Sequence, residues 1–158
     1  DKEETDVTER EHKLAVLGEI ARALNGGDVV WAVGGSLLLY CKGKTDTFRD
    51  IDIMVWEEHV ETLKALLLPL GILAPPAPNP GYKTRHFLNF TIRGVEVDVM
   101  GGMVIVKDGK DYDCSLSPSQ VAEYIWINGE RIPLQSLEDW RRYYLLMGRE
   151  EKAAMIDC

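Results

Sequence analysis

Three aspartates and one glutamate alternate with aliphatic residues in two short segments of this 158-residue chain, at Asp50, Asp52, Glu96 and Asp98. Residues two apart on a β-strand point to the same face, so each segment would carry carboxylates on one face and Ile or Val side chains on the other. Two such carboxylates would lie about 6.6 Å apart along their strand, and a neighbouring strand would lie about 4.8 Å away. Charges gathered in this way repel one another unless a cation lies between them.

Magnesium is the cation expected on such a face, with manganese as an alternative. Mg²⁺ takes oxygen ligands and is usually bound together with substrate phosphates. Paired carboxylates can also bracket two cations about 4 Å apart, as in two-metal phosphoryl-transfer sites. An apolar strand with aspartates on one face is otherwise costly, because buried charges need a partner. We therefore predict a metal site at the two acidic segments, with Glu96 at its rim.

A second motif, Gly34-Gly35-Ser36, ends the apolar run of residues 29–33. If that run is a buried strand, the paired glycines allow a tight turn into the next helix and let another group approach the backbone closely. Free N–H groups at this turn and the Ser36 hydroxyl would favour an anion such as phosphate. The turn is a weak signal alone, but beside the acidic strand it predicts a site for phosphate and metal together.

The elements that would position these motifs follow from the hydrophobic pattern. Apolar residues recur at helical spacing from Leu14 to Leu24, and we expect the highly charged residues 1–11 to be frayed. A buried strand over 29–33, a short buried helix after Ser36, the strand that opens at Asp50 and a helix over 57–68 come next. Five of the seven prolines lie in residues 69–80, which predicts an extended loop.

Three dipeptides between apolar runs predict β-hairpins, namely Arg93-Gly94, Asp108-Gly109 and Asn128-Gly129. The first of these hairpins would place a strand over 87–92 beside the strand that carries Asp98. Ser136, with an acidic residue three positions later, is typical of a helix start and predicts a helix that includes residues 140–147. A short last helix should follow Arg149.

Length and composition limit the function classes. A chain of 158 residues with 46% hydrophobic and 28% charged residues is expected to form one domain over 1–158. The formal net charge of −8 argues against bulk nucleic-acid binding, which uses clustered Lys and Arg. The sequence shows no signal peptide and no apolar run long enough to span a membrane, so we expect a cytoplasmic location and no membrane partner.

Taken together, the Gly-Gly-Ser turn, Asp50-Ile51-Asp52 and Asp98 resemble the motifs of the nucleotidyltransferase superfamily, which includes DNA polymerase beta, CCA-adding enzymes and antibiotic nucleotidyltransferases. The sequence is most similar to minimal, single-domain prokaryotic members, and residues 136–158 are similar to their closing helices. The resemblance implies an α/β (α+β) nucleotidyltransferase fold, in which a mixed central sheet is flanked by helices and followed by short C-terminal helices.

The resemblance also implies roles for these residues. Asp50 and Asp52 would hold two metal ions at the transferring phosphorus, and Asp98 would bind the acceptor-side metal and help to deprotonate the attacking hydroxyl. The Gly-Gly-Ser turn would hold the terminal phosphates. Arg49 would contact the nucleotide, unless it forms a salt bridge with a neighbouring aspartate. The reaction would be metal-dependent transfer of a nucleoside monophosphate from a nucleoside triphosphate, most simply ATP, to an unknown hydroxyl acceptor on a small molecule or a protein.

Other functions stay open at this point. Only about sixty residues follow Asp98, too few for the helical domain that grips the base in larger members. This favours a catalytically inactive nucleotide- or partner-binding module, including a member of a toxin–antitoxin pair, and a protein partner or homodimer is an alternative arrangement. A metal-dependent phosphohydrolase would need similar carboxylates. The sequence assigns no role to five basic residues, Lys83, Arg85, His86, Arg149 and Lys152, which are by default solvated.

Overall fold

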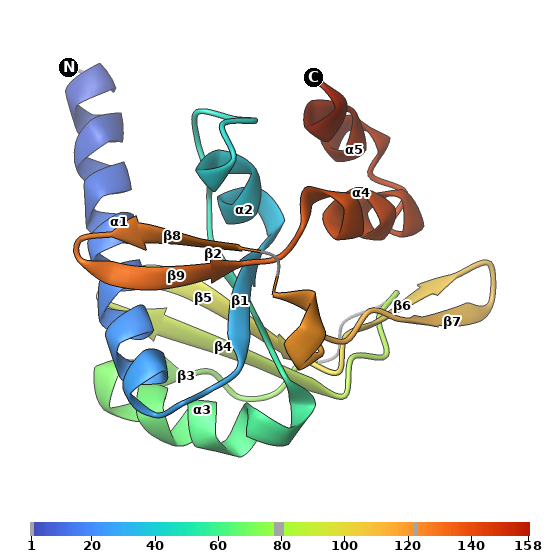
Figure 1. Cartoon of the computed structure of the whole chain (residues 1–158), viewed down its shortest axis with the longest axis horizontal. Helices are drawn as coiled ribbons and strands as arrows, with labels where there is room; N and C mark the ends of the chain where they lie inside the picture. Colours follow the sequence, from blue (N-terminus) through green and yellow to red (C-terminus); the bar gives the residue numbers. More distant parts are fainter. Residues whose placement is uncertain (1, 78–80, 122) are drawn as a thin grey trace.

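The chain folds around a seven-stranded mixed sheet, with strands in the order β3-β4-β5-β2-β1-β9-β8 (Figure 1). The computed structural model describes residues 2–77, 81–121 and 123–158. The strands of the main sheet are β1 (Trp31–Gly34), β2 (Ile51–Val55), β3 (Ile72–Leu73), β4 (His86–Ile92), β5 (Val95–Gly101), β8 (Glu123–Ile127) and β9 (Glu130–Leu134). The mixed sheet with flanking helices confirms the fold class that the sequence predicted.

Five α-helices surround the sheet in the described residues: α1 (Lys2–Gly26), α2 (Gly35–Cys41), α3 (Val60–Leu67), α4 (Leu137–Leu146) and α5 (Glu150–Asp157). Short 3₁₀ turns cover Glu57–His59, Leu68–Leu70 and Pro118–Gln120. In Figure 1, α4 and α5 (red) lie together at the opposite end of the view from α1 (blue), on the side of the small two-stranded sheet. None of the described helices is long and apolar enough to cross a lipid bilayer.

The three central strands bring the predicted motifs together. β2 runs parallel to β5 and places Asp52 directly opposite Asp98. On its other side β2 runs antiparallel to β1, so that Gly34 lies opposite Asp52. The Ile and Val residues that alternate with the acidic positions, including Ile51 and Val97, are fully buried in the core. Burial of these aliphatic side chains fixes the register, because a slip of one residue would turn the carboxylates into the core.

All three predicted hairpins are present. The central turn residues of each have positive φ, as a two-residue type I′ turn requires: Arg93, Gly94, Asp108, Gly109, Asn128 and Gly129. The turn at Arg93-Gly94 joins β4 to β5, and the turn at Asn128-Gly129 joins β8 to β9. The remaining turn joins β6 (Val104–Lys107) to β7 (Lys110–Asp113), which form the separate two-stranded sheet.

The structure differs from the sequence expectations in three places. Helix α1 begins at Lys2 and includes the charged segment that was expected to be frayed. Its Glu, Lys and Arg residues are good helix formers that need no burial, and the Thr8 hydroxyl bonds to a backbone oxygen one turn earlier. The proline-rich loop contains the short strand β3, placed before its run of prolines, while residues 78–80 lie outside the described residues. Asp50 lies just before β2, which begins at Ile51.

Candidate active site

A pocket of about 400 Å³ lies beside β2 and β5 and is closed on the other side by the C-terminal helices. It contains six of the seven predicted site residues, namely Gly35, Ser36, Arg49, Asp50, Asp52 and Asp98. The sequence analysis did not assign the ten other lining residues, Tyr82, Thr84, Phe87, Met100, Met103, Trp140, Tyr144, Met147, Arg149 and Lys152. The pocket therefore has an acidic side built from strands and a basic, aromatic side built from helices.

The aspartates on the strand side perturb one another. Burial, reinforced by the charges of Asp98 and Asp50, raises the pKa of Asp52 to about 8, although Lys152 and Arg149 act in the opposite direction. Burial also raises the pKa of Asp98, and a hydrogen bond from Asn89 partly offsets this effect. Without a cation, burial and mutual repulsion make the ionised form of these aspartates unfavourable. Oxygen-only donors in this electrostatic setting suit a hard divalent ion.

Metal binding would need a rearrangement of side chains. Within residues 2–77, 81–121 and 123–158, no group of three or more His, Cys, Asp or Glu residues is already arranged around a common metal position. Asp52 and Asp98 face each other on adjacent parallel strands, while Asp50 lies on the less constrained segment before β2. The donor set fits Mg²⁺ or Mn²⁺ by its chemistry.

The two glycines of the Gly-Gly-Ser turn make room for different neighbours. A Cβ atom at Gly34 would lie 2.4 Å from the ring of Trp140, and one at Gly35 would lie 2.0 Å from Asp52 Oδ2. Gly35 also has a φ of +60°, a conformation that side-chain-bearing residues rarely adopt. The close approach expected at this turn is therefore made by the acidic strand and by α4. The phosphate-binding role of the turn stays a prediction.

Asn89 is a site residue that sequence reasoning missed. Its amide Nδ2 donates to Asp98 Oδ1 over 2.7 Å and to Glu96 Oε2 over 2.9 Å. These bonds orient the Asp98 carboxylate. Glu96 is exposed and does not line the pocket, so its place at the rim of the site stays a prediction. Asn89 could have been found by counting outward from the Arg93-Gly94 turn, because the hairpin register places it opposite Asp98.

The helix side of the pocket depends on a well-fixed α4. The Ser136 hydroxyl caps this helix by accepting a hydrogen bond from the backbone N–H of Asp139 at 3.0 Å, which confirms the predicted start. The Trp140 indole donates to Gln135 Oε1 at 2.7 Å, and its ring lies 5.4 Å from that of Tyr144. Tyr144 is only 3% exposed, yet it lines the pocket. This face is rigid and aromatic.

Two groups of basic residues have different environments. Arg149 and Lys152 line the pocket, and the Lys152 ammonium has no ion-pair partner among the described residues. Arg149 pairs with the exposed Glu151 at 3.1 Å and lies over the Tyr144 ring.

Lys83, Arg85 and His86, by contrast, form ion pairs outside the pocket: Lys83 with Asp111, and Arg85 and His86 with Glu57. Arg49 is exposed at the pocket and forms no ion pair with a described residue, so the expected alternative of a salt bridge to a neighbouring aspartate is not seen in the structure.

A mixed sheet that places aspartates of two adjacent parallel strands beside a Gly-Gly-Ser turn fits the nucleotidyltransferase fold that the sequence resemblance implies. The sequence profile of the aminoglycoside-2''-adenylyltransferase family matches residues 16–156, and the chain belongs to that family. This confirms the resemblance to the nucleotidyltransferase superfamily. No curated protein matches the chain in sequence.

Solved structures share the fold. A Thermotoga maritima protein assigned as a nucleotidyltransferase is 28% identical, with a TM-score of 0.75 over 94% of this chain and 92% of that one. The antibiotic-resistance factor ANT(2'')-Ia, in complex with adenylyl-2''-tobramycin, is 15% identical, with a TM-score of 0.63 over 92% of this chain and 87% of its own. The lincosamide adenylyltransferase LnuA, with lincomycin bound, is 15% identical, with a TM-score of 0.53 over 85% and 89% of the two chains.

Proposed function

We propose that this nucleotidyltransferase transfers a nucleoside monophosphate, most simply AMP from ATP, to a hydroxyl group of an acceptor and releases pyrophosphate. The observation that carries the proposal is the pairing of Asp52 with Asp98 across β2 and β5, on the floor of a pocket whose opposite side carries Arg149 and Lys152. In such a pocket the aspartates would hold metal ions, and the two basic residues would bind the charge of a polyphosphate. Family membership supports adenylyl transfer as the chemistry.

The acidic side would hold the metal. Asp50, Asp52 and Asp98 are the residues that would bind Mg²⁺ or Mn²⁺, which when bound neutralises charge at the transferring phosphate. The pKa of Asp98 is raised by burial, which makes this carboxylate a better proton acceptor than an exposed aspartate. Asp98, oriented by Asn89, would therefore accept the proton of the attacking hydroxyl.

The basic side would bind the leaving group. Arg149 and Lys152 are positioned to contact the β- and γ-phosphates, together with Ser36 and the backbone of the Gly-Gly-Ser turn. Arg49, exposed and without an ion-pair partner among the described residues, is available for the same substrate. Tyr144 also lines the pocket, and its hydroxyl would be a further donor to a phosphate or ribose oxygen. These donors would order the triphosphate so that its α-phosphorus lies at the aspartates.

The acceptor is most simply a hydroxyl compound that enters beside Asp98, where Phe87 and Met100 of the paired strands β4 and β5 line the pocket. ANT(2'')-Ia with adenylyl-2''-tobramycin and LnuA with lincomycin are similar folds with antibiotic ligands. Aminoglycosides and lincosamides are therefore the first acceptors to test, and proteins are the second.

Calorimetric titration of ATP tests the nucleotide and metal parts of this proposal. We expect binding that requires Mg²⁺ or Mn²⁺ and that is lost in the Asp52→Asn variant. The matched control is Asp46→Asn, which removes an exposed carboxylate from the loop after α2. Absence of ATP binding by the wild-type chain with either metal would refute the proposal. Equal binding of ATP with and without the metal would also refute it.

A further inference from the structure

One wall of the pocket is a third strand added to the small hairpin. Tyr82 pairs antiparallel with Ile105 of β6. Backbone N–H groups of Lys83, Arg85 and Val106 donate across this junction to the carbonyl groups of Val104, Gly102 and Gly81, at 3.0 to 3.1 Å. We call residues 81–85 together with β6 and β7 the flap. Helix α4 contacts β6 of the flap.

Residues of segment 81–85 alternate between the pocket and the outer surface. Tyr82 and Thr84 line the pocket, while Lys83 and Arg85 form ion pairs on the other side. This is the alternation of an extended strand. A contact that holds the Arg85 side chain in place should therefore also hold Tyr82 and Thr84, on the opposite face of the same segment, in their positions at the pocket.

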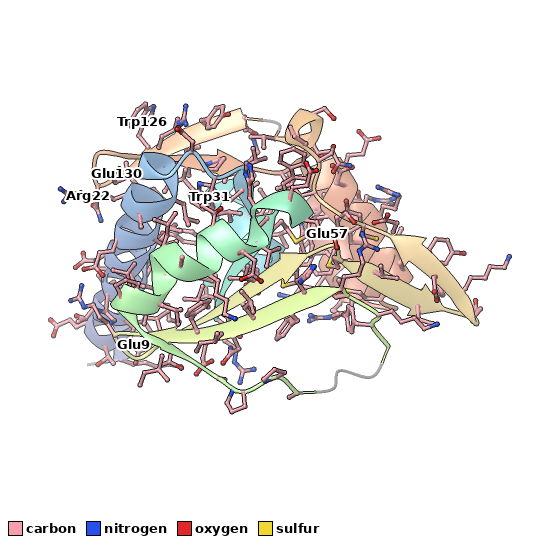
Figure 2. All side chains as sticks on the ribbon, turned by 90° about the horizontal axis from the view of Figure 1, so that it is seen from below. Glu9, Arg22, Trp31, Glu57, Trp126 and Glu130 are labelled. Carbon is pink, nitrogen blue, oxygen red and sulfur yellow. The ribbon has the colours of Figure 1, made fainter. Side chains whose placement is uncertain are left out.

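Arg85 is held by an ordered cluster at the back of the flap. Its Nε donates to Glu57 Oε2 at 2.7 Å and its Nη2 donates to Ser115 Oγ at 3.1 Å, with an Asp113 carboxylate 3.9 Å away. Glu57 follows β2 by two residues, so it is fixed to the strand that carries Asp52. Figure 2 shows Glu57 at the N-terminal end of α3, on the side of the molecule that carries the hairpin.

The backbone is shaped to admit this cluster. Gly102 has a φ of +66°, and a Cβ atom there would lie 2.7 Å from Arg85 Nε and 2.9 Å from Glu57 Oε2. The same residue accepts the backbone hydrogen bond from Arg85. A side chain at position 102 would thus displace both the ion pair and the edge of the flap.

The cluster contributes little to global stability, because the side chains of Arg85 and Glu57 are 44% and 34% exposed. Exposed ion pairs are worth little in unfolding free energy. Their effect should be on local geometry. On the pocket side, Tyr82 lines the same pocket as Arg149 and Asp52, where the proposed nucleotide would bind.

We propose that Glu57 and Arg85 are positioning residues, which hold Tyr82 and Thr84 of the flap against the bound nucleotide. The inference rests on the proposed function for the identity of the ligand. The contacts that define the flap do not depend on the proposed function. The substrate contact is made by Tyr82 and Thr84, and the Glu57 carboxylate acts through Arg85.

Two measurements on the full chain test this inference. Arg85→Met should increase hydrogen exchange of the backbone amides at positions 83, 85 and 106, while exchange within β4 and β5 is unchanged. The same substitution should raise the Kd of MgATP about tenfold. Lys83→Met is the matched control, because it removes the other outward ion pair of the same segment. The charge-swapped pair Glu57→Arg with Arg85→Glu should restore much of the affinity.

A double-mutant cycle tests whether the effect passes through Tyr82. The changes in the free energy of MgATP binding caused by Tyr82→Phe and by Arg85→Met should be less than additive in the double variant. The reason is that Arg85 acts through Tyr82, which the double variant has already altered. Unchanged exchange in Arg85→Met, or a Kd equal to that of Lys83→Met, would overturn the inference while leaving the proposed function intact. Failure of the wild-type chain to bind any nucleotide would overturn both.

Discussion

The two sides of the pocket are built from different kinds of structure and carry opposite charge. The acidic side comes from strands in the centre of the sheet, where Asp52 and Asp98 are fixed by register with buried aliphatic neighbours on either side. The basic side comes from the last helices, where Arg149 and Lys152 stand at the pocket on a short, partly exposed segment. The sheet register thus fixes the acidic side, while the two basic residues lie at the start of α5 and within it.

The basic residues near the site differ in whether they are paired with carboxylates. Lys83 and Arg85 are paired with carboxylates on the outer surface, and His86 Nε2 lies 3.3 Å from Glu57 Oε2. Lys152 has no such partner among the described residues, and its charge offsets part of the rise that burial causes in the pKa of Asp52. An unpaired cation beside a carboxylate of raised pKa is the arrangement expected where an anionic, metal-bound substrate completes the charge balance.

The largest effect should come from removing one charge on the strand side. We expect Asp52→Asn to lower nucleotidyl transfer by at least about 1,000-fold, since the metal loses a central ligand. Transfer of label from ATP measures this. The fold should be retained, because Asn is nearly isosteric with Asp, and a circular dichroism spectrum equal to that of wild type is the control. Activity within about tenfold of wild type would exclude Asp52 as a metal ligand.

Removing charge from the helix side should have the next largest effect. Arg149→Met combined with Lys152→Met should raise the Kd of MgATP by about 100-fold, because both side chains would contact phosphate oxygens. Titration calorimetry measures the change. Lys110→Met, an exposed position of β7, is the matched control for loss of a positive charge. Equal affinity in the double variant and the control would show that the helix side does not bind the polyphosphate.

Asn89 connects the strand side to its rim, and its loss should have an intermediate effect. Asn89→Leu should weaken Mg²⁺ binding about tenfold, because Asp98 loses the donor that orients it. Thr91→Val is the comparison variant, since it removes only the 3.3 Å bond to Glu96. If both variants bind Mg²⁺ equally, the Asn89 amide has no orienting role.

The smallest predicted effect is on stability and depends on pH. Asp52 has a pKa of about 8 in the folded chain against an ordinary value of 3.8. The folded state therefore holds this proton more tightly than the unfolded state, and the resulting stabilisation is full below pH 3.8 and is lost as pH rises toward 8. Without metal, Asp52→Asn should exceed wild type in Tm by several degrees near pH 8 and by less near pH 5, as measured by thermal denaturation.

Metal provides the control for this prediction. Mg²⁺ should raise the Tm of the wild type at pH 8 more than that of Asp52→Asn, since a ligand that binds only the folded state stabilises it. A difference in Tm between the two proteins that does not change with pH would contradict the assignment of the proton to Asp52.

Much of the strand side could be predicted from the sequence, because it depends on local pattern. Alternation around Asp50, Asp52 and Asp98 indicated the acidic face, and dipeptides such as Arg93-Gly94 fixed the hairpins. The roles of the two glycines could be predicted only in part. Close approach was expected at Gly34 and Gly35, but that their neighbours are Trp140 and Asp52 is a tertiary contact.

The helix side and the flap could not be predicted in the same way. Tyr82 and Thr84 reach the pocket through pairing with β6, which lies about twenty residues further along the chain, and no local pattern specifies that pairing. Arg85 and Arg149 are equally basic in sequence. Only the fold shows that Arg85 lies beside Glu57 and that Arg149 lines the pocket.

The most direct test of the account follows two labels from one substrate. The chain is incubated with Mg²⁺ and ATP labelled at either the α- or the γ-phosphate, with tobramycin, lincomycin or a protein extract as the acceptor source. The account predicts that the α-label appears on an acceptor and the γ-label in pyrophosphate, and that Asp52→Asn gives neither product. Release of the γ-label as inorganic phosphate without transfer of the α-label would contradict nucleotidyl transfer and indicate hydrolysis.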